Sequence, residues 1–147
     1  AKPKPLTTRF VERVAQPGEI VFVLPLPPKK LSPNGRGLYW MAKAKAIKSY
    51  RNACTALMRN AKQEPFAGRV AIDLEFYLCR VFNDTKSYYP NDEDNARGSV
   101  KAAQDALKDA GIIKKFVRVG KTTLYTRAKE HQGFTCVVMT LRKDESE

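Results

Sequence analysis

Residues 70–78 read VAIDLEFYL, and this stretch decides the fold class. Large apolar side chains occupy every second position, at Val70, Ile72, Leu74, Phe76 and Leu78. A period of two residues is typical of a β-strand and predicts one that is half-buried. The breaker EPFAG at 64–68 precedes it, and the polar, turn-rich NDTKSYYPN at 83–91 follows it.

Two helices are predicted, one before and one after this strand. The second runs from about 95 to 110, where small apolar residues share one face and Gly111 is expected to end the helix. The first runs from 42 to 62, where apolar residues recur every three or four positions, at Ile47, Tyr50, Cys54, Leu57 and Ala61.

Further strands complete the pattern. EIVFVLPL at 19–26 is rich in β-branched residues and is halted by prolines, and short strands are predicted at 115–119 and 122–128. The apolar run 134–141 follows. Because strands and helices interleave without strict βαβ alternation, the predicted fold is α+β, a mixed sheet of about four strands with two main helices on one face.

The length of 147 residues suits one domain, and we expect a basic, partly ordered arm at 1–17, the domain at 18–142 and a charged tail at 143–147. No apolar run approaches ~18 residues and no signal-like start is seen, so a soluble, intracellular protein is expected, neither secreted nor bound to a membrane. The three cysteines are widely spaced beside a single histidine, which favours structural thiols over zinc.

The 27 Lys and Arg residues exceed the 15 acidic ones, and the net charge of +12 favours a nucleic-acid partner. No helix-turn-helix, zinc-finger or basic-zipper pattern is present, so recognition of DNA shape is expected. Aromatic residues in predicted loops are candidates for base stacking, although Trp40 is expected to pack on the proline-rich strand. The candidate DNA contacts, each of which an ordinary solvated surface explains as well, are Lys29, Lys30, Arg36, Lys43, Lys45, Lys48 and Arg51.

Two carboxylates one residue apart, Asp92 and Asp94, lie in basic surroundings. A divalent cation or a helix N-terminus would offset their repulsion. Mg²⁺, with Mn²⁺ as an alternative, binds such oxygens together with water and substrate phosphate. Lys101 comes seven residues after Asp94, about two helical turns, and is expected on the same face, beside a scissile phosphate. The competing interpretation is ordinary helix capping.

DEDN at 92–95, Lys101, DAL at 105–107 and AGII at 110–113 together resemble the signature of RusA-type Holliday junction resolvases, and LPLPP at 24–28 is similar to that family's opening strand. The resemblance covers roughly residues 18–142. It implies a small homodimeric, metal-dependent endonuclease, often phage-encoded, that cuts four-way DNA junctions without a small-molecule cofactor. Such a protein is expected in the cytoplasm of a bacterial host cell or associated with the nucleoid. The resemblance also implies that Asp92 and Asp94 bind the metal, that Lys101 is the basic catalytic residue, and that Asn95 and Asp105 support them.

One departure from the family pattern concerns catalysis. Where the family places an acidic pair that supplies a third catalytic aspartate, this chain has Lys114 and Lys115. Candidate substitutes are Asp73, Glu75, Asp109 or a partner subunit. Asn91 also stands where the family often has a basic residue. The lysines at the third-acid position leave open a weakened relative that binds branched DNA or a protein without cleaving. The charge and size of the chain also leave open a ribosomal-type RNA-binding module.

Overall fold

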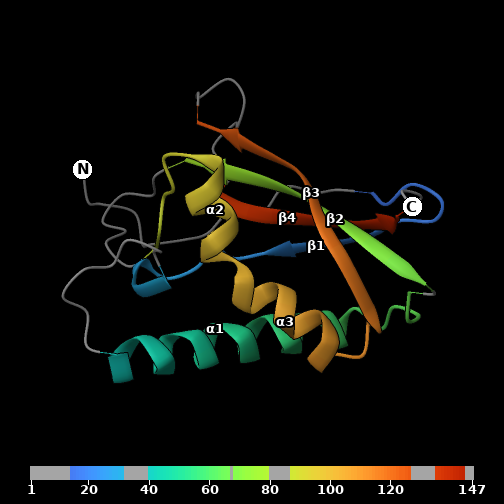
Figure 1. Cartoon of the computed structure of the whole chain (residues 1–147), viewed down its shortest axis with the longest axis horizontal. Helices are drawn as coiled ribbons and strands as arrows, with labels where there is room; N and C mark the ends of the chain where they lie inside the picture. Colours follow the sequence, from blue (N-terminus) through green and yellow to red (C-terminus); the bar gives the residue numbers. More distant parts are fainter. Residues whose placement is uncertain (1–13, 32–39, 67, 80–86, 127–134, 145–147) are drawn as a thin grey trace, which may run out of the picture.

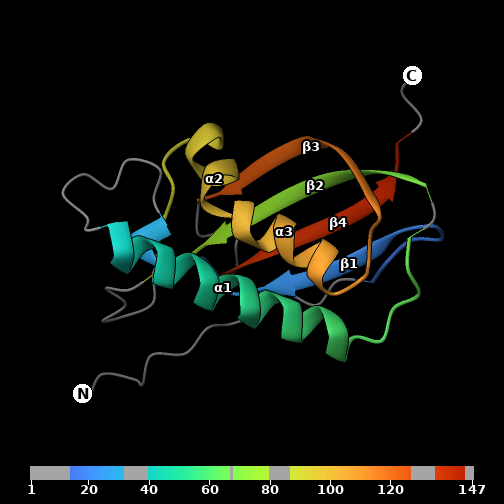
Figure 2. The same cartoon turned by 60° about the horizontal axis from the view of Figure 1, so that its bottom comes forward.

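The computed structural model describes residues 14–31, 40–66, 68–79, 87–126 and 135–144. In these residues, four strands form one mixed sheet whose one face is covered by helices (Figures 1 and 2). The predicted α+β class is thereby confirmed. In chain order the elements are β1 (Ile20–Leu24), η1 (Lys29–Leu31), α1 (Trp40–Asn60), β2 (Arg69–Leu78), α2 (Glu93–Ser99), α3 (Lys101–Asp109), β3 (Lys115–Tyr125) and β4 (Thr135–Lys143).

The sheet has the strand order β1-β4-β2-β3. The two pairs that include β4 are antiparallel, whereas β2 and β3 are parallel. The predicted strand at 70–78 is β2, an internal strand with a neighbour on each side. Its more polar face is therefore also partly covered, so that Ala71 and Tyr77 are buried and Asp73 and Glu75 are half-buried.

The core lies between the sheet and the helices. The alternating apolar residues of β2 are almost completely buried there together with residues of α1, α3 and β4. Burying a large apolar side chain contributes about 1.5–3 kcal/mol, so this layer dominates stability. A smaller cluster on the other sheet face contains Tyr77, Cys136 and Val138. Burial raises the pKa of the core thiol Cys54 to about 11, which keeps it protonated and unreactive.

Helix α1 agrees with the predicted 42–62 segment, although its buried stripe is narrower. Tyr50, Cys54 and Met58 are buried, whereas Ile47 and Leu57 are 38% and 43% exposed. The Tyr50 hydroxyl donates to the Pro25 carbonyl at 2.6 Å and so joins α1 to the chain that leaves β1. No helix in the described part of the chain combines the length and apolarity needed to cross a bilayer.

The prediction of one continuous helix at 95–110 is wrong, because this segment forms two helices, α2 and α3. Val100 has φ −107° and ψ 16°, outside the helical region, and separates α2 from α3. Gly98 and Ser99 precede it, and the Ser99 hydroxyl donates to the Ala96 carbonyl at 2.7 Å. A glycine, a side chain that competes for a helical carbonyl and a β-branched residue in succession favour such a break. Gly111, at φ +73°, ends α3 as predicted.

The two short strands predicted around 115–128 are one continuous strand, β3. Gly120 lies within it, where the pairing with β2 shifts register between Ile72 and Leu74. Asp73 lies at this irregularity, and its Oδ1 accepts a hydrogen bond from the Lys121 backbone N–H at 2.8 Å. Because this side chain satisfies the Lys121 N–H at the irregularity, the strand continues past Gly120.

Candidate functional site

The predicted acidic residues line an open hollow beside the edge strand. Residues 91–95 lead into α2, which begins next to the C-terminal half of β3 (Figure 1). Together with residues 121–124 of β3 they line a space of about 950 Å³, here named the acidic hollow. Two segments far apart in the sequence therefore meet at one site.

Asp92 is the N-cap of α2. Its Oδ1 accepts a hydrogen bond from the Asn95 backbone N–H at 2.8 Å, and its Oδ2 accepts one from Asn95 Nδ2 at 2.9 Å. The backbone of Asp92 is extended, at φ −143° and ψ 167°, as is usual for a cap. The capping interpretation considered from the sequence therefore describes Asp92 in this structure. Asn95 therefore holds both carboxylate oxygens of Asp92 through its backbone and side-chain N–H groups.

Asp94 is 89% exposed and pairs with Arg97 one turn later. Arg97 Nη1 also donates to Thr122 Oγ1 at 3.4 Å and lies 3.9 Å from Glu93 Oε2. Sequence reasoning missed Arg97, although its spacing of three and four residues from two acids is a recognised helical ion-pair pattern. Thr122 has no such signal, because its proximity arises from the packing of β3 beside α2.

Lys101 does not line the acidic hollow. It is the first residue of α3, beyond the break at Val100, so the argument from two continuous helical turns no longer applies. Lys101 instead lines a second space of about 330 Å³ between α1 and α3, here named the interhelical hollow, together with Lys43 and Asp105. The structure thus places the two predicted catalytic features in separate hollows.

Arg51 and Asp105, predicted as a DNA contact and a supporting acid, lie between the same two helices. Arg51 binds Asp109 through two hydrogen bonds, Nε to Oδ2 at 2.5 Å and Nη2 to Oδ1 at 2.8 Å, and its Nη1 lies 3.9 Å from Asp105 Oδ2. The hydrogen bond from Arg51 lowers the pKa of Asp109. Arg59 Nη2 also donates to the Asp109 carbonyl oxygen at 3.0 Å. Arg51 therefore joins α1 to α3.

The candidate substitutes for the missing acid lie elsewhere. Asp73 and Glu75 line a different hollow, of about 320 Å³, on the sheet face away from the helices, and Lys121 borders both spaces. Glu75 Oε2 accepts hydrogen bonds from Tyr77 at 3.1 Å and from Tyr125 at 3.3 Å, whose rings stack. Asp109 is engaged by Arg51. None of the three acids lines the acidic hollow.

The lysines at the family's third-acid position are also remote. Lys115 is the first residue of β3 and lies opposite Arg69 in the register with β2. Thr122 borders the acidic hollow near the other end of the strand. At a rise of about 3.3 Å per residue, these two positions are roughly 20 Å apart. Among the described residues, no three Asp, Glu, His or Cys side chains are grouped so that they could hold a metal ion.

Asp73 is the acid with the clearest electrostatic perturbation on this sheet. Burial acts to raise its pKa, but hydrogen bonds from Arg142 and from the Lys121 N–H, with the charges of Arg142 and Arg118, outweigh burial. The pKa of Asp73 therefore lies below its ordinary value. Arg142 Nε donates to Asp73 Oδ2 at 2.7 Å, and this hydrogen bond raises the pKa of Arg142. These shifts indicate a structural ion pair.

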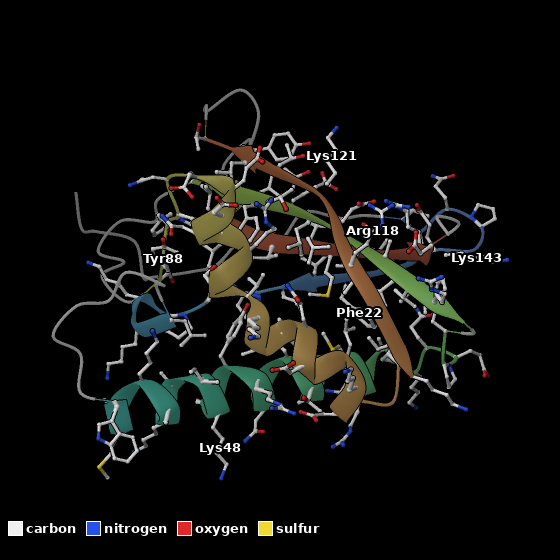
Figure 3. The ribbon with its side chains drawn as sticks, in the orientation of Figure 1. Phe22, Lys48, Tyr88, Arg118, Lys121 and Lys143 are labelled. Carbon is white, nitrogen blue, oxygen red and sulfur yellow. The ribbon has the colours of Figure 1, made fainter. Side chains whose placement is uncertain are left out.

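The remaining predicted DNA contacts surround α1. Lys29 and Lys30 are exposed on η1, which packs against the helix, and Lys45 and Lys48 are exposed on α1 itself. Figure 3 shows Lys48 pointing away from the sheet. Within the described segments none of these four lysines takes part in an ion pair, and α1 contains no acidic residue. Arg36 lies outside the described residues.

The aromatic residues predicted in loops are Tyr39, Trp40, Tyr88 and Tyr89. Trp40 is the first residue of α1 and is 72% exposed, so the predicted packing on the proline-rich strand is wrong. The Tyr88 N–H donates to the Pro27 carbonyl at 2.8 Å, and Tyr89 packs against the core. Figure 3 shows Tyr88 beside this proline-containing segment. Tyr39 lies outside the described residues.

No protein-family model matches the chain, and no curated protein sequence matches it.

Proposed function

We propose that this protein is a metal-dependent endonuclease of the RusA type that cuts four-way DNA junctions. The observation that carries the proposal is the acidic hollow, in which Asp92 and Asp94 lie beside the edge strand of a protein with a net charge of +12. An acidic patch in a strongly basic protein is electrostatically suited to a divalent cation, and the basic remainder is suited to the phosphate backbone.

The donor chemistry fits Mg²⁺ as a two-carboxylate site. Mg²⁺ is commonly held by one or two carboxylates, with water and substrate phosphate completing its shell. Asp92 and Asp94 are the residues that would hold it, and the ion would supply charge neutralisation and an activated water. With Asp92 capping α2 and Asp94 paired with Arg97, affinity in the absence of DNA is expected to be weak.

The proposal also assigns roles to residues that surround the two carboxylates. Lys121 borders the acidic hollow, and Arg97 pairs with Asp94, which lines it. Both cations would contact the phosphate that enters the hollow. The cap formed with Asn95 orients Asp92. Two identical sites are needed to cut opposite strands of a nearly two-fold symmetric junction, so the active form is expected to be a homodimer.

Cleavage of a labelled synthetic junction tests the proposal. The wild-type protein is expected to make paired nicks that require Mg²⁺ or Mn²⁺, and to leave linear duplex uncut. Asp94→Asn is expected to abolish nicking while junction binding persists. Glu64→Gln, which removes an exposed carboxylate outside the hollow, is the matched control and should cut normally. Equal cutting by Asp94→Asn and Glu64→Gln would overturn the assignment.

A second candidate function is binding to branched DNA without cleavage. It is favoured by the pairing of Asp94 with Arg97 and by the placement of Asp73, Glu75 and Asp109 outside the acidic hollow. This candidate predicts tight junction binding and no nicks with either cation. Greater affinity for RNA duplexes than for junctions would instead support a ribosomal-type RNA-binding module.

A further inference from the structure

The interhelical hollow brings together two lysines from different helices. Lys43 comes from the first turn of α1 and Lys101 from the first residue of α3, and both line the same space of about 330 Å³. Lys43 precedes the buried Tyr50 by seven residues, so it lies on the inner side of α1. This orientation separates Lys43 from Lys48, which points to solvent (Figure 3).

The charge balance of the interhelical hollow is positive. Neither Lys43 nor Lys101 forms an ion pair with a described residue, and Asp105 is the one acid among the lining residues. Asp105 also lies 3.9 Å from Arg51, so its charge is shared with a third cation. The exposed lysines of η1, Lys29 and Lys30, add to the same field, because η1 packs against α1.

The walls of this hollow are partly apolar. Leu31, Ile47 and Ala102 line it beside the two lysines. Apolar walls exclude water and lower the local dielectric response, which strengthens the attraction between a cation and an anion. Two ammonium groups in such a setting are suited to a small, strongly charged anion such as a phosphodiester group.

The position of this hollow relates it to the acidic hollow. Gly98 and Ser99, at the C-terminal end of α2, border the interhelical hollow, whereas residues 92–95 at the other end of α2 border the acidic one. A helix of this length spans about 10 Å. The axial rise of about 3.4 Å per nucleotide is a lower limit on the spacing of successive phosphates, so this distance corresponds to at most about three nucleotides of one DNA strand.

We propose that Lys43 and Lys101 bind a backbone phosphate that flanks, by at most about three nucleotides, the phosphate at the acidic hollow. The proposal rests on the proposed function in taking DNA as the ligand, but it does not require cleavage. Lys101 thereby acts in positioning the strand and does not contact the scissile group.

Junction affinity measured against salt concentration tests this inference. Lys43→Gln/Lys101→Gln is compared with Lys62→Gln/Lys108→Gln, which removes the same charge just after the end of α1 and from the last turn of α3. The first variant is expected to lower the slope of log affinity against log salt by about one counterion. The control should keep the wild-type slope, and thermal melting should show both variants folded.

A second measurement locates the phosphate. Single methylphosphonate linkages, which lack the charge, are placed along the cut strand and binding is measured with Asp94→Asn protein. One position within about three nucleotides of the nick should weaken binding when Lys43 and Lys101 are present and have no effect when both are Gln.

The outcomes separate the two proposals. Cleavage with identical salt slopes for the two double variants overturns the flanking-phosphate site alone. Binding with the expected loss of slope, but without nicks, supports this site and overturns the nuclease. Failure of the wild-type protein to bind junctions overturns both.

Discussion

Arg142 on β4 donates a hydrogen bond from Nε to Asp73 Oδ2 on β2 at 2.7 Å, and this pair lies directly against Gly120 of β3. A Cβ atom at position 120 would lie 2.4 Å from Asp73 Oδ1 and 2.9 Å from Arg142 Nη2. The ion pair therefore joins β4 to β2 and leaves room only for glycine at position 120 of β3. Through Lys121 N–H, it holds the strand that borders the acidic hollow.

Gly120→Ala is expected to destabilise the protein by about 1–3 kcal/mol, because the added methyl forces the ion pair to move. Chemical denaturation with urea measures the change. The penalty should shrink in an Asp73→Ala background, where the nearest obstructing atom is absent. An equal penalty in both backgrounds would mean that the contact with Asp73 is not its cause.

Stability should decline at acidic pH partly through Asp73. The pKa of Asp73 is lowered in the folded state, so its carboxylate contributes to stability above its unfolded pKa of about 3.9. This contribution is lost as the pH falls through the pKa of the folded state. The gap in unfolding free energy between wild type and Asp73→Asn should be constant from neutral pH to about pH 5 and should narrow below about pH 4. A gap that widens on acidification contradicts the assignment.

Two substitutions at Asp92 are expected to have different effects on stability and the same effect on cleavage. Asn caps a helix about as well as Asp, whereas Ala forfeits about 1 kcal/mol. Asp92→Asn should therefore retain wild-type thermal stability, and Asp92→Ala should melt lower, while both lose junction cleavage. If Asp92→Asn nicks junctions at the wild-type rate, Asp92 is a cap without a role in metal binding.

Arg97 is expected to compete with metal for Asp94. An exposed ion pair is worth up to about 1 kcal/mol, so Arg97→Gln should tighten Mn²⁺ binding by at most about fivefold. Titration followed by electron paramagnetic resonance of free Mn²⁺ measures this. Arg118→Gln is the control, since Arg118 pairs with Asp144 instead. Mn²⁺ binding by Arg97→Gln that is no tighter than binding by Arg118→Gln would mean that Arg97 does not compete with the metal for Asp94.

Local patterns were informative where one element determines the outcome. The alternation at 70–78 predicts β2, the three-and-four spacing predicts α1, and Gly111 predicts the end of α3. The cap residue Asp92 was also among the sequence alternatives. These features depend on neighbours within a few residues, so periodicity and capping preferences are sufficient to find them.

The placement of Lys101, the choice of Arg97 as the partner of Asp94 and the continuity of β3 were not predicted. The first two have local signals that were overlooked: the succession of Gly98, Ser99 and Val100, and the spacing of Arg97 three residues after Asp94. The continuity of β3 depends instead on the hydrogen bond from Lys121 to Asp73, which is distant in sequence. The sequence by itself determined the α+β class, the basic charge and the acidic cluster. The tertiary structure decided which cations meet which acids, because that depends on packing between elements and not on their periodicity.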